Sequence, residues 1–160
     1  VMYTGRHLLV GLSPRTNDAG ASFLKKIFDN VDVIVIPRVR DNALHLKCAL
    51  THIDERNCVV SSKPDALATA QAVNEAIKVQ SPNSSEPYTF HSTGAEEIFA
   101  NVVRVNETLL VPSAPSSDAM KCYSHILGAD IGIENIVQVP WREFAKADGA
   151  LTCRSVLMRV

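Results

Sequence analysis

One complete supersecondary unit can be read from residues 100–139, ANVVRVNETLLVPSAPSSDAMKCYSHILGADIGIENIVQV. Two short apolar runs flank the polar pair 106–107, which has the length of a tight hairpin turn. A segment with helical periodicity follows, and a last apolar run closes the pattern. In order, the predicted elements are a strand over 100–105, a strand over 108–112, a helix from 116 or 117 to 127, and a strand over 135–139. This order predicts a hairpin whose second strand is joined through a helix to a parallel neighbour.

The same order of elements occurs twice before this unit. The first copy has a strand remnant at 1–4, a turn at Gly5-Arg6, a strand over 7–12, a helix from 17 or 18 to 29, and a strand over 31–36. The second has a strand over 43–51, a turn at 54–56, a strand over 58–61, a helix from 64 or 65 to 78, and a weak strand over 88–90. The units are about 1–40, 41–92 and 98–140, a repeat of about 50 residues. An α/β protein of pseudo-symmetric units is predicted, with chance similarity of spacing as the alternative.

Both ends of the chain are interpreted as incomplete units. Residues 1–4 resemble the remainder of a first strand, and residues 150–159 resemble a first strand that no further unit follows. A strand without neighbours exposes unpaired backbone groups along both of its edges. We therefore expect the chain to be cut from a longer closed ring, in which the absent part supplies partners for the terminal strand.

The composition is that of an ordinary folded domain. The 160 residues are 46% hydrophobic and 21% charged, which excludes a disordered chain. A net charge of −1 creates no field that would select nucleic acid or an anionic lipid surface, and no apolar run reaches the roughly 18–20 residues of a membrane span. The four cysteines lack the spacing of a zinc site or of a disulfide scaffold. No metal or cofactor is expected, and the cytoplasm is the expected location.

A histidine and a cysteine occupy matching positions of the predicted repeat. His45 lies at the start of the first strand of the second unit, and Cys153 lies at the start of the terminal strand. In a ring of units such positions surround one axis, where the two side chains could meet. A thiolate that attacks and an imidazole that moves protons are the minimum for nucleophilic catalysis. The alternative is that both are packed core residues.

Several short segments carry a resemblance to a known family. They are Gly5-Arg6, VGLS (10–13), Arg15-Thr16-Asn17, LHLK (44–47) and DGALTCRSVL (148–157). In this order, and at nearly these spacings, they resemble dimethylarginine dimethylaminohydrolase of the guanidine-modifying superfamily. Residues 61–135 match in element order only. The resemblance implies that the chain is the C-terminal three fifths of a five-unit β/α-propeller.

The resemblance also implies roles for individual residues. Cys153 would be the nucleophile that attacks the guanidinium carbon of a methylated arginine, and His45 would protonate the departing amine and then activate water. Arg15 would bind the substrate carboxylate, because a guanidinium suits bidentate recognition. Asp148 and the backbone of Ala147 would line the amino-acid end of the substrate. The alternatives are a solvated loop charge for Arg15 and a turn residue for Asp148.

The chain departs from the family pattern at two positions. Cys48 stands where the family commonly has Ser, which weakens a polar contact near the substrate, and Arg154 replaces a second cysteine found in several members. The carboxylates with which the family binds the substrate cation and orients the histidine precede the segment that matches Gly5, and this chain lacks them. The predicted reaction is therefore the hydrolysis of dimethylarginine to citrulline and an amine, once that N-terminal part is supplied.

Two other functions stay open. One is a related arginine deiminase or amidinotransferase, and the other is a non-catalytic, partner-binding fragment of the same fold. The expected small-molecule partner is a methylated arginine. The expected protein partner is the missing N-terminal segment or a second copy of the chain.

Overall fold

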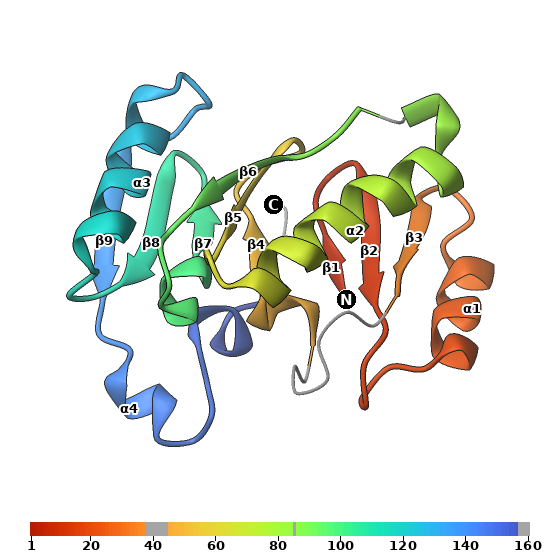
Figure 1. The fold of residues 1–160 in the computed structure, drawn as a ribbon, viewed down its shortest axis with the longest axis horizontal. Coiled ribbons are helices and arrows are strands. Elements are labelled where there is room, and N and C mark those ends of the chain that lie inside the picture. Colours follow the sequence, from red (N-terminus) through yellow and green to blue (C-terminus); the bar gives the residue numbers. More distant parts are fainter. Residues whose placement is uncertain (38–44, 85, 157–160) are drawn as a thin grey trace.

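A computed structural model describes residues 1–37, 45–84 and 86–156, which form three small sheets and four α-helices (Figure 1). The first unit contains β1 (Met2–Tyr3), β2 (His7–Gly11), α1 (Asp18–Ile27) and β3 (Asp32–Ile36). The second contains β4 (Leu50–His52), β5 (Asn57–Val60), α2 (Pro64–Gln80) and β6 (Thr89–Ser92). The third contains β7 (Val103–Val105), β8 (Thr108–Pro112), α3 (Ser117–Gly128) and β9 (Asn135–Val139), and α4 (Arg142–Ala145) follows it. None of the described helices has the length and hydropathy needed to cross a membrane.

All three sheets have the same topology. The first two strands of each sheet pair antiparallel as a hairpin, and the second and third pair parallel across the intervening helix. Equivalent parallel pairs are Leu9 with Ile34 in the first sheet and Leu109 with Ile136 in the third. The strand–strand–helix–strand order predicted from the sequence is therefore confirmed, as is the strand remnant at the start of the chain.

Local sequence signals explain where the helices and the first turn form. Asn17 and Ser116 cap α1 and α3, because each side-chain oxygen accepts a hydrogen bond from the backbone N–H three residues later, at 2.9 and 3.3 Å. Pro64 begins α2, at a position where a missing N–H leaves no helical bond unmade. Gly5 in the β1–β2 turn has a φ of 93°, which glycine adopts far more readily than other residues.

Each long helix packs against the unit that precedes it as well as against its own. α2 lies against β3, and α3 lies against β6 (Figure 1). One core cluster therefore joins the first two units, and another joins the second and third units. Fully buried members of the two clusters include Leu9, Ile34, Leu50, Ile77, Val59, Leu109 and Tyr123. Burial of one such aliphatic side chain contributes about 1.5–3 kcal/mol to folding, so these shared cores hold neighbouring units together.

The first strands of the second and third units are shorter than predicted. The sequence predicted strands over 43–51 and 100–105, whereas a turn of 3₁₀-helix precedes each strand: η1 (Leu46–Cys48) before β4 and η3 (Glu97–Ala100) before β7. Residues 43 and 44 lie outside the described residues. Leu46 and Phe99 are buried, so the apolar character that suggested a strand comes from the packing of these turns against the core.

The terminal strand predicted over 150–159 is wrong over its first half. Leu151–Arg154 forms another 3₁₀ turn, η4, in which the Cys153 N–H donates to the Ala150 carbonyl at 3.1 Å. The Ser155 hydroxyl donates to the Leu151 carbonyl at 2.7 Å, and Leu151 is buried. This local bonding favours a turn over an extended strand. Residues 157–160 lie outside the described residues.

Candidate active site

Two of the 3₁₀ turns carry the predicted catalytic pair, and one buried amide is bonded to both. His45 immediately precedes η1, and Cys153 lies within η4. Asn101 Nδ2 donates to the Lys47 carbonyl at 3.2 Å and to Thr152 Oγ1 at 3.0 Å. Asn101 Oδ1 accepts from the Thr152 N–H at 2.9 Å, and the side chain is buried. The structure therefore brings together the turns of the two residues that the sequence predicted to meet.

His45 is half-buried and lies beside the thiol of Cys48. Cys48 Sγ is 3.4 Å from His45 Nδ1 and 3.9 Å from Nε2. The turn of η1 produces this contact because it brings residues three apart in sequence to the same side. Sulfur forms weaker hydrogen bonds than a serine hydroxyl would form at this position. The structure thus places Cys48 against the imidazole.

The four cysteines, all of them among the described residues, differ in their access to solvent. Cys58 and Cys122 are buried, Cys48 is half-buried and Cys153 is exposed. Burial raises the pKa of the Cys58 thiol, and it raises the pKa of Cys122 to about 11. Both of these thiols stay protonated at neutral pH and are poor nucleophiles. Of the four, Cys153 is the exposed one, and it directly follows Thr152, which is bonded to the Asn101 amide.

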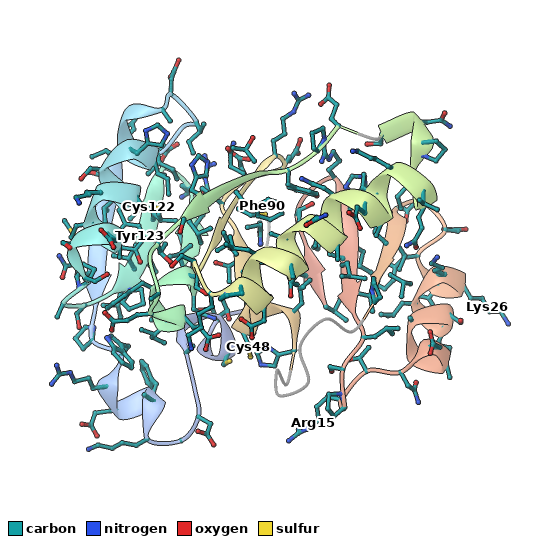
Figure 2. The ribbon with its side chains drawn as sticks, in the orientation of Figure 1. Arg15, Lys26, Cys48, Phe90, Cys122 and Tyr123 are labelled. Atoms are coloured by element: carbon teal, nitrogen blue, oxygen red, sulfur yellow. The ribbon has the colours of Figure 1, made fainter. Side chains whose placement is uncertain are left out.

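Arg15 lies in the loop between β2 and α1. Its side chain is exposed and projects downward beyond the ribbon (Figure 2), and η1 and η4 lie in the lower half of the same view (Figure 1). The Arg15 N–H donates to Ser13 Oγ at 3.1 Å, which helps to close the loop. Among the described residues, no hydrogen bond or ion pair joins Arg15 to His45 or Cys153.

Ala147 and Asp148 lie in the exposed turn between α4 and η4. The Asp148 N–H donates to the Ala145 carbonyl at 3.1 Å, and Asp148 has a φ of 51°. A left-handed backbone at an Asp-Gly pair is what a turn requires. Within the described part of the chain, no hydrogen bond or ion pair joins the Asp148 carboxylate to His45 or Cys153. The turn leads directly into η4 and so fixes the start of the segment that carries Cys153.

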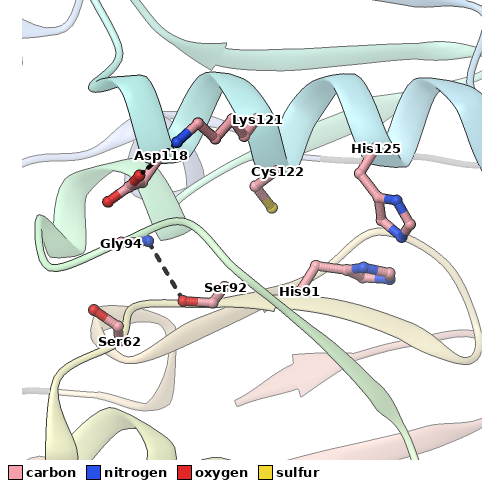
Figure 3. Close-up of a pocket in the computed structure, with 8 residues that line it drawn as sticks. All are labelled: Ser62, His91, Ser92, Gly94, Asp118, Lys121, Cys122 and His125. Carbon is pink, nitrogen blue, oxygen red and sulfur yellow. Dashed lines mark hydrogen bonds and ion pairs between the residues drawn. The ribbon is translucent and has the colours of Figure 1, made fainter.

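A separate pocket of about 440 Å³ lies between β6 and α3 (Figure 3). His91 and His125 face each other across it, with ring centroids 5.7 Å apart. Desolvation, reinforced by the charge of His125, lowers the pKa of His91, whose Nε2 lies 2.9 Å from Asn57 Oδ1. Cys122 also lines the pocket, but its raised pKa leaves no activated thiol there. Across the described residues, no three or more His, Cys, Asp or Glu side chains are grouped so as to hold a metal ion.

Comparison with known proteins finds sequence and structural similarity to one enzyme over nearly the whole chain. The chain is 24% identical over 156 residues to N(G),N(G)-dimethylarginine dimethylaminohydrolase of Pseudomonas aeruginosa, a match covering 98% of this chain and 53% of that protein. The solved structure of this enzyme from P. aeruginosa, as a cysteine-to-serine variant complexed with citrulline, aligns with a TM-score of 0.64 at 20% identity. That alignment covers 95% of this chain and 51% of the other. The chain has the β/α-propeller fold of dimethylarginine dimethylaminohydrolase.

The same propeller fold is found in a deiminase. C. jejuni agmatine deiminase aligns with a TM-score of 0.63 at 18% identity, over 95% of this chain and 52% of the other. No protein-family model matches the sequence. The chain spans about half the length of the relatives it matches. Its three sheets are therefore part of a propeller, as the sequence predicted.

Asn101 is a site residue that the sequence reasoning missed. It lies within the strand predicted over 100–105, where it interrupts the apolar run from Phe99 to Val103, and no role was predicted for it. A polar side chain inside a buried segment is nearly always hydrogen-bonded, so its position was a signal that partners must lie nearby. The identity of those partners, about 50 residues away on either side, was not readable from the sequence.

Proposed function

We propose that this chain carries the nucleophile and the proton-transfer residue of a guanidine hydrolase that converts an N-methylated arginine to citrulline and a methylated amine. The observation that carries the proposal is the Asn101 amide, which is bonded to the turn after His45 and to the residue before Cys153. Solvent access at Cys153 supports its role as the nucleophile. The shared fold with an enzyme crystallised with citrulline supports the product class.

The first half-reaction forms a covalent intermediate. The Cys153 thiolate bonds to the guanidinium carbon, and the electron pair of its C=N bond moves onto nitrogen. The His45 imidazolium gives a proton to the methylated nitrogen, the C–N bond breaks, and dimethylamine or methylamine leaves. The remaining amidine carbon is joined to Cys153 as a thiouronium.

The second half-reaction hydrolyses that intermediate. Neutral His45 removes a proton from water, whose oxygen adds to the same carbon. The C–S bond then breaks and restores the Cys153 thiolate, while His45 keeps the proton needed for the next cycle. The remaining hydroxyl proton passes to solvent and on to the released amine, and citrulline is left as product.

Arg15, Asp148 and Ala147 are proposed to bind the amino-acid end of the substrate. Arg15 lies in the loop between β2 and α1, and Ala147 and Asp148 lie in the loop between α4 and η4. Both loops are in the lower half of Figure 1, where η1 and η4 also lie, which supports a common site. A guanidinium at position 15 can bind a carboxylate with two parallel hydrogen bonds. Cys48, which contacts the imidazole, is proposed to border the substrate on the His45 side.

The guanidinium group of the substrate also needs negative partners. A cation that is partly removed from water is unfavourable without a counter-charge. We propose that carboxylates from the remainder of the propeller supply it, through association with an N-terminal segment. The coverage of about half of each relative supports this division of the site.

Hydrolysis of a guanidine with loss of ammonia is the second candidate. The fold shared with C. jejuni agmatine deiminase favours it, since both classes of enzyme break a C–N bond of a guanidine. The LHLK and LTC segments favour the dimethylarginine substrate. The nature of the released amine separates the two candidates.

The test is an assay of the full protein with asymmetric dimethylarginine, arginine and agmatine, in which citrulline, dimethylamine and ammonia are quantified. We expect dimethylamine and citrulline in equal amounts, and a loss of at least about 100-fold in Cys153→Ser because a hydroxyl is far less acidic than a thiol of pKa ~8.5. Cys122→Ala, which removes a buried thiol outside the site, is the matched control and should retain turnover. Ammonia from arginine or agmatine would establish the deiminase instead, and full activity of Cys153→Ser would reject the nucleophile.

A further inference from the structure

We infer that Asn101 is a positioning residue, which holds the His45 turn and the Cys153 turn in the register needed for attack by the Cys153 thiolate and for proton transfer by His45. The inference rests on the proposed function. It assigns a task to a residue that touches neither the thiol nor the imidazole among the described contacts. Asn101 acts instead through the backbone on which each of those groups is mounted.

The hydrogen-bonding geometry gives Asn101 this role. The two donors of its amide go to different turns, one to the Lys47 carbonyl of η1 and one to Thr152 Oγ1 of η4. Its oxygen accepts from the Thr152 N–H, so donors and acceptor are all engaged. The side chain is 5% exposed, and water therefore competes little for these bonds. One planar group thus fixes the separation of two backbone segments.

The fold explains why the amide is available at this place. Asn101 directly follows η3, the turn of the third unit, and η3 packs against η1. The equivalent turns of successive units thus converge, and the residue at the end of one of them can bond to the other two. A strand at any of these places would point its side chains alternately to opposite faces and would not form this junction.

Each turn also has an anchor of its own. Leu46 in η1 and Leu151 in η4 are both 6% exposed and are held by hydrophobic packing. Loss of the Asn101 amide should therefore leave both turns folded but allow them to shift relative to each other. Displacements of about 1 Å are enough to reduce proton-transfer and attack rates by about 100-fold.

Asn74 offers a matched control. It is half-buried on α2, and its amide also makes a two-point contact, donating to the Tyr88 carbonyl at 3.1 Å and accepting from the Tyr88 N–H at 2.8 Å. Both bonds go to a single residue, Tyr88, which belongs to neither the His45 turn nor the Cys153 turn. Replacement of Asn74 removes the same number of backbone contacts without loosening the candidate site.

The experiment measures the rate at which iodoacetamide alkylates Cys153 in the full protein, followed by mass spectrometry of the peptide that contains it. This rate needs no substrate, and a neighbouring imidazolium should raise it by favouring the thiolate. We expect His45→Ala and Asn101→Ala each to slow alkylation about tenfold, and the double variant to be no slower than either one. Asn74→Ala should alkylate at the wild-type rate. Steady-state assays should show a loss in kcat for Asn101→Ala with KM changed less than about threefold.

Asn101→Asp identifies which link matters. A carboxylate can still accept from the Thr152 N–H and hydroxyl, but it cannot donate to the Lys47 carbonyl. If Asn101 joins the two turns, this variant should be as slow as Asn101→Ala. Wild-type rates in Asn101→Asp would show that only η4 needs support and would overturn the inference.

The remaining outcomes separate this inference from the proposed function. If His45→Ala slows alkylation but Asn101→Ala does not, or if their effects multiply, the positioning role is wrong and the Cys–His pair stands. If Asn74→Ala slows alkylation as much as Asn101→Ala, general loosening explains the effect and the positioning role is again wrong. If His45→Ala leaves the rate unchanged, the pair itself fails, and the proposed function and the inference fail together.

Discussion

Arg15 is exposed in its loop, and its side chain projects away from the ribbon (Figure 2). Loss of a bidentate, charge-assisted contact costs on the order of 1.5–3 kcal/mol. We expect Arg15→Ala to raise KM for dimethylarginine by about tenfold or more and to leave kcat nearly unchanged. Steady-state kinetics with Lys26→Ala, which removes an exposed cation of α1, provides the control for net charge. An unchanged KM would show that Arg15 is a solvated loop charge that does not bind the substrate carboxylate.

His52 makes the stability of the fold depend on pH. Desolvation, followed by the positive charge of Lys47, lowers its pKa from 6.5 to about 4. The unfolded chain therefore binds a proton at a higher pH than the folded one, so the contribution of neutral His52 is complete above pH 6.5 and is lost as the pH falls toward 4. Urea unfolding should show a loss on the order of 1–3 kcal/mol from this residue over that range.

The matched variant for this prediction is His52→Gln, which removes the titration. Its unfolding free energy should fall less steeply between pH 6.5 and pH 4 than that of the wild type. Some slope should remain, because burial also lowers the pKa of His7 and His91. Parallel slopes for the two proteins would show that His52 does not titrate in this way.

At the scale of secondary structure, a single cap stabilises the start of α3. Ser116 Oγ accepts from the Ala119 N–H at 3.3 Å, and this helix covers the third sheet and packs against β6. Ser116→Ala should lower the free energy of unfolding by about 1 kcal/mol. Ser124→Ala, at an exposed interior position of the same helix, should change it little or raise it slightly. Urea denaturation decides the matter, and equal stability of the two variants would contradict the capping role.

Helical periodicity and short apolar runs predicted most elements well. The strands 108–112 and 135–139 agree with β8 and β9 to the residue, and α3 differs from its prediction only at its end. The sequence predicted a strand over η1, over η4 and at Ala100, the end of η3, because a short apolar run has no periodicity that separates a strand from a turn. What makes η4 a turn is bonding that local sequence does not reveal, including the contact of Thr152 with Asn101.

The candidate site was also predictable only in part, because tertiary contacts decide which side chains meet. Equivalent positions in a repeat, together with the family resemblance, singled out His45 and Cys153. The amide that bridges their turns comes from a third unit, and its partners are set by tertiary packing. The pocket between β6 and α3 gave no sequence signal either, because His91 and His125 belong to different elements of different units.

At the scale of the whole molecule, the proposed site needs more than these residues. The chain covers about half of each relative, and the substrate cation needs carboxylates that the site described above does not provide. We expect the 160-residue chain alone to show no significant citrulline formation and to self-associate. Addition of an N-terminal propeller segment in trans should restore measurable turnover. Sedimentation and a citrulline assay test this, and an active monomer without additions would contradict it.

The packing of each long helix against the preceding unit has a consequence for how the protein opens. β3 is buried along most of its length beneath α2, whereas its counterpart β9 is largely exposed, with Val137 46% accessible. A strand with fewer buried side chains needs less free energy to open locally than a well-buried one. Local opening should therefore be most frequent at the outer face of the third sheet and least frequent where the first two units pack together. We therefore propose β9 as the surface on which a further propeller unit would dock, and we expect such docking to slow the opening of the third sheet.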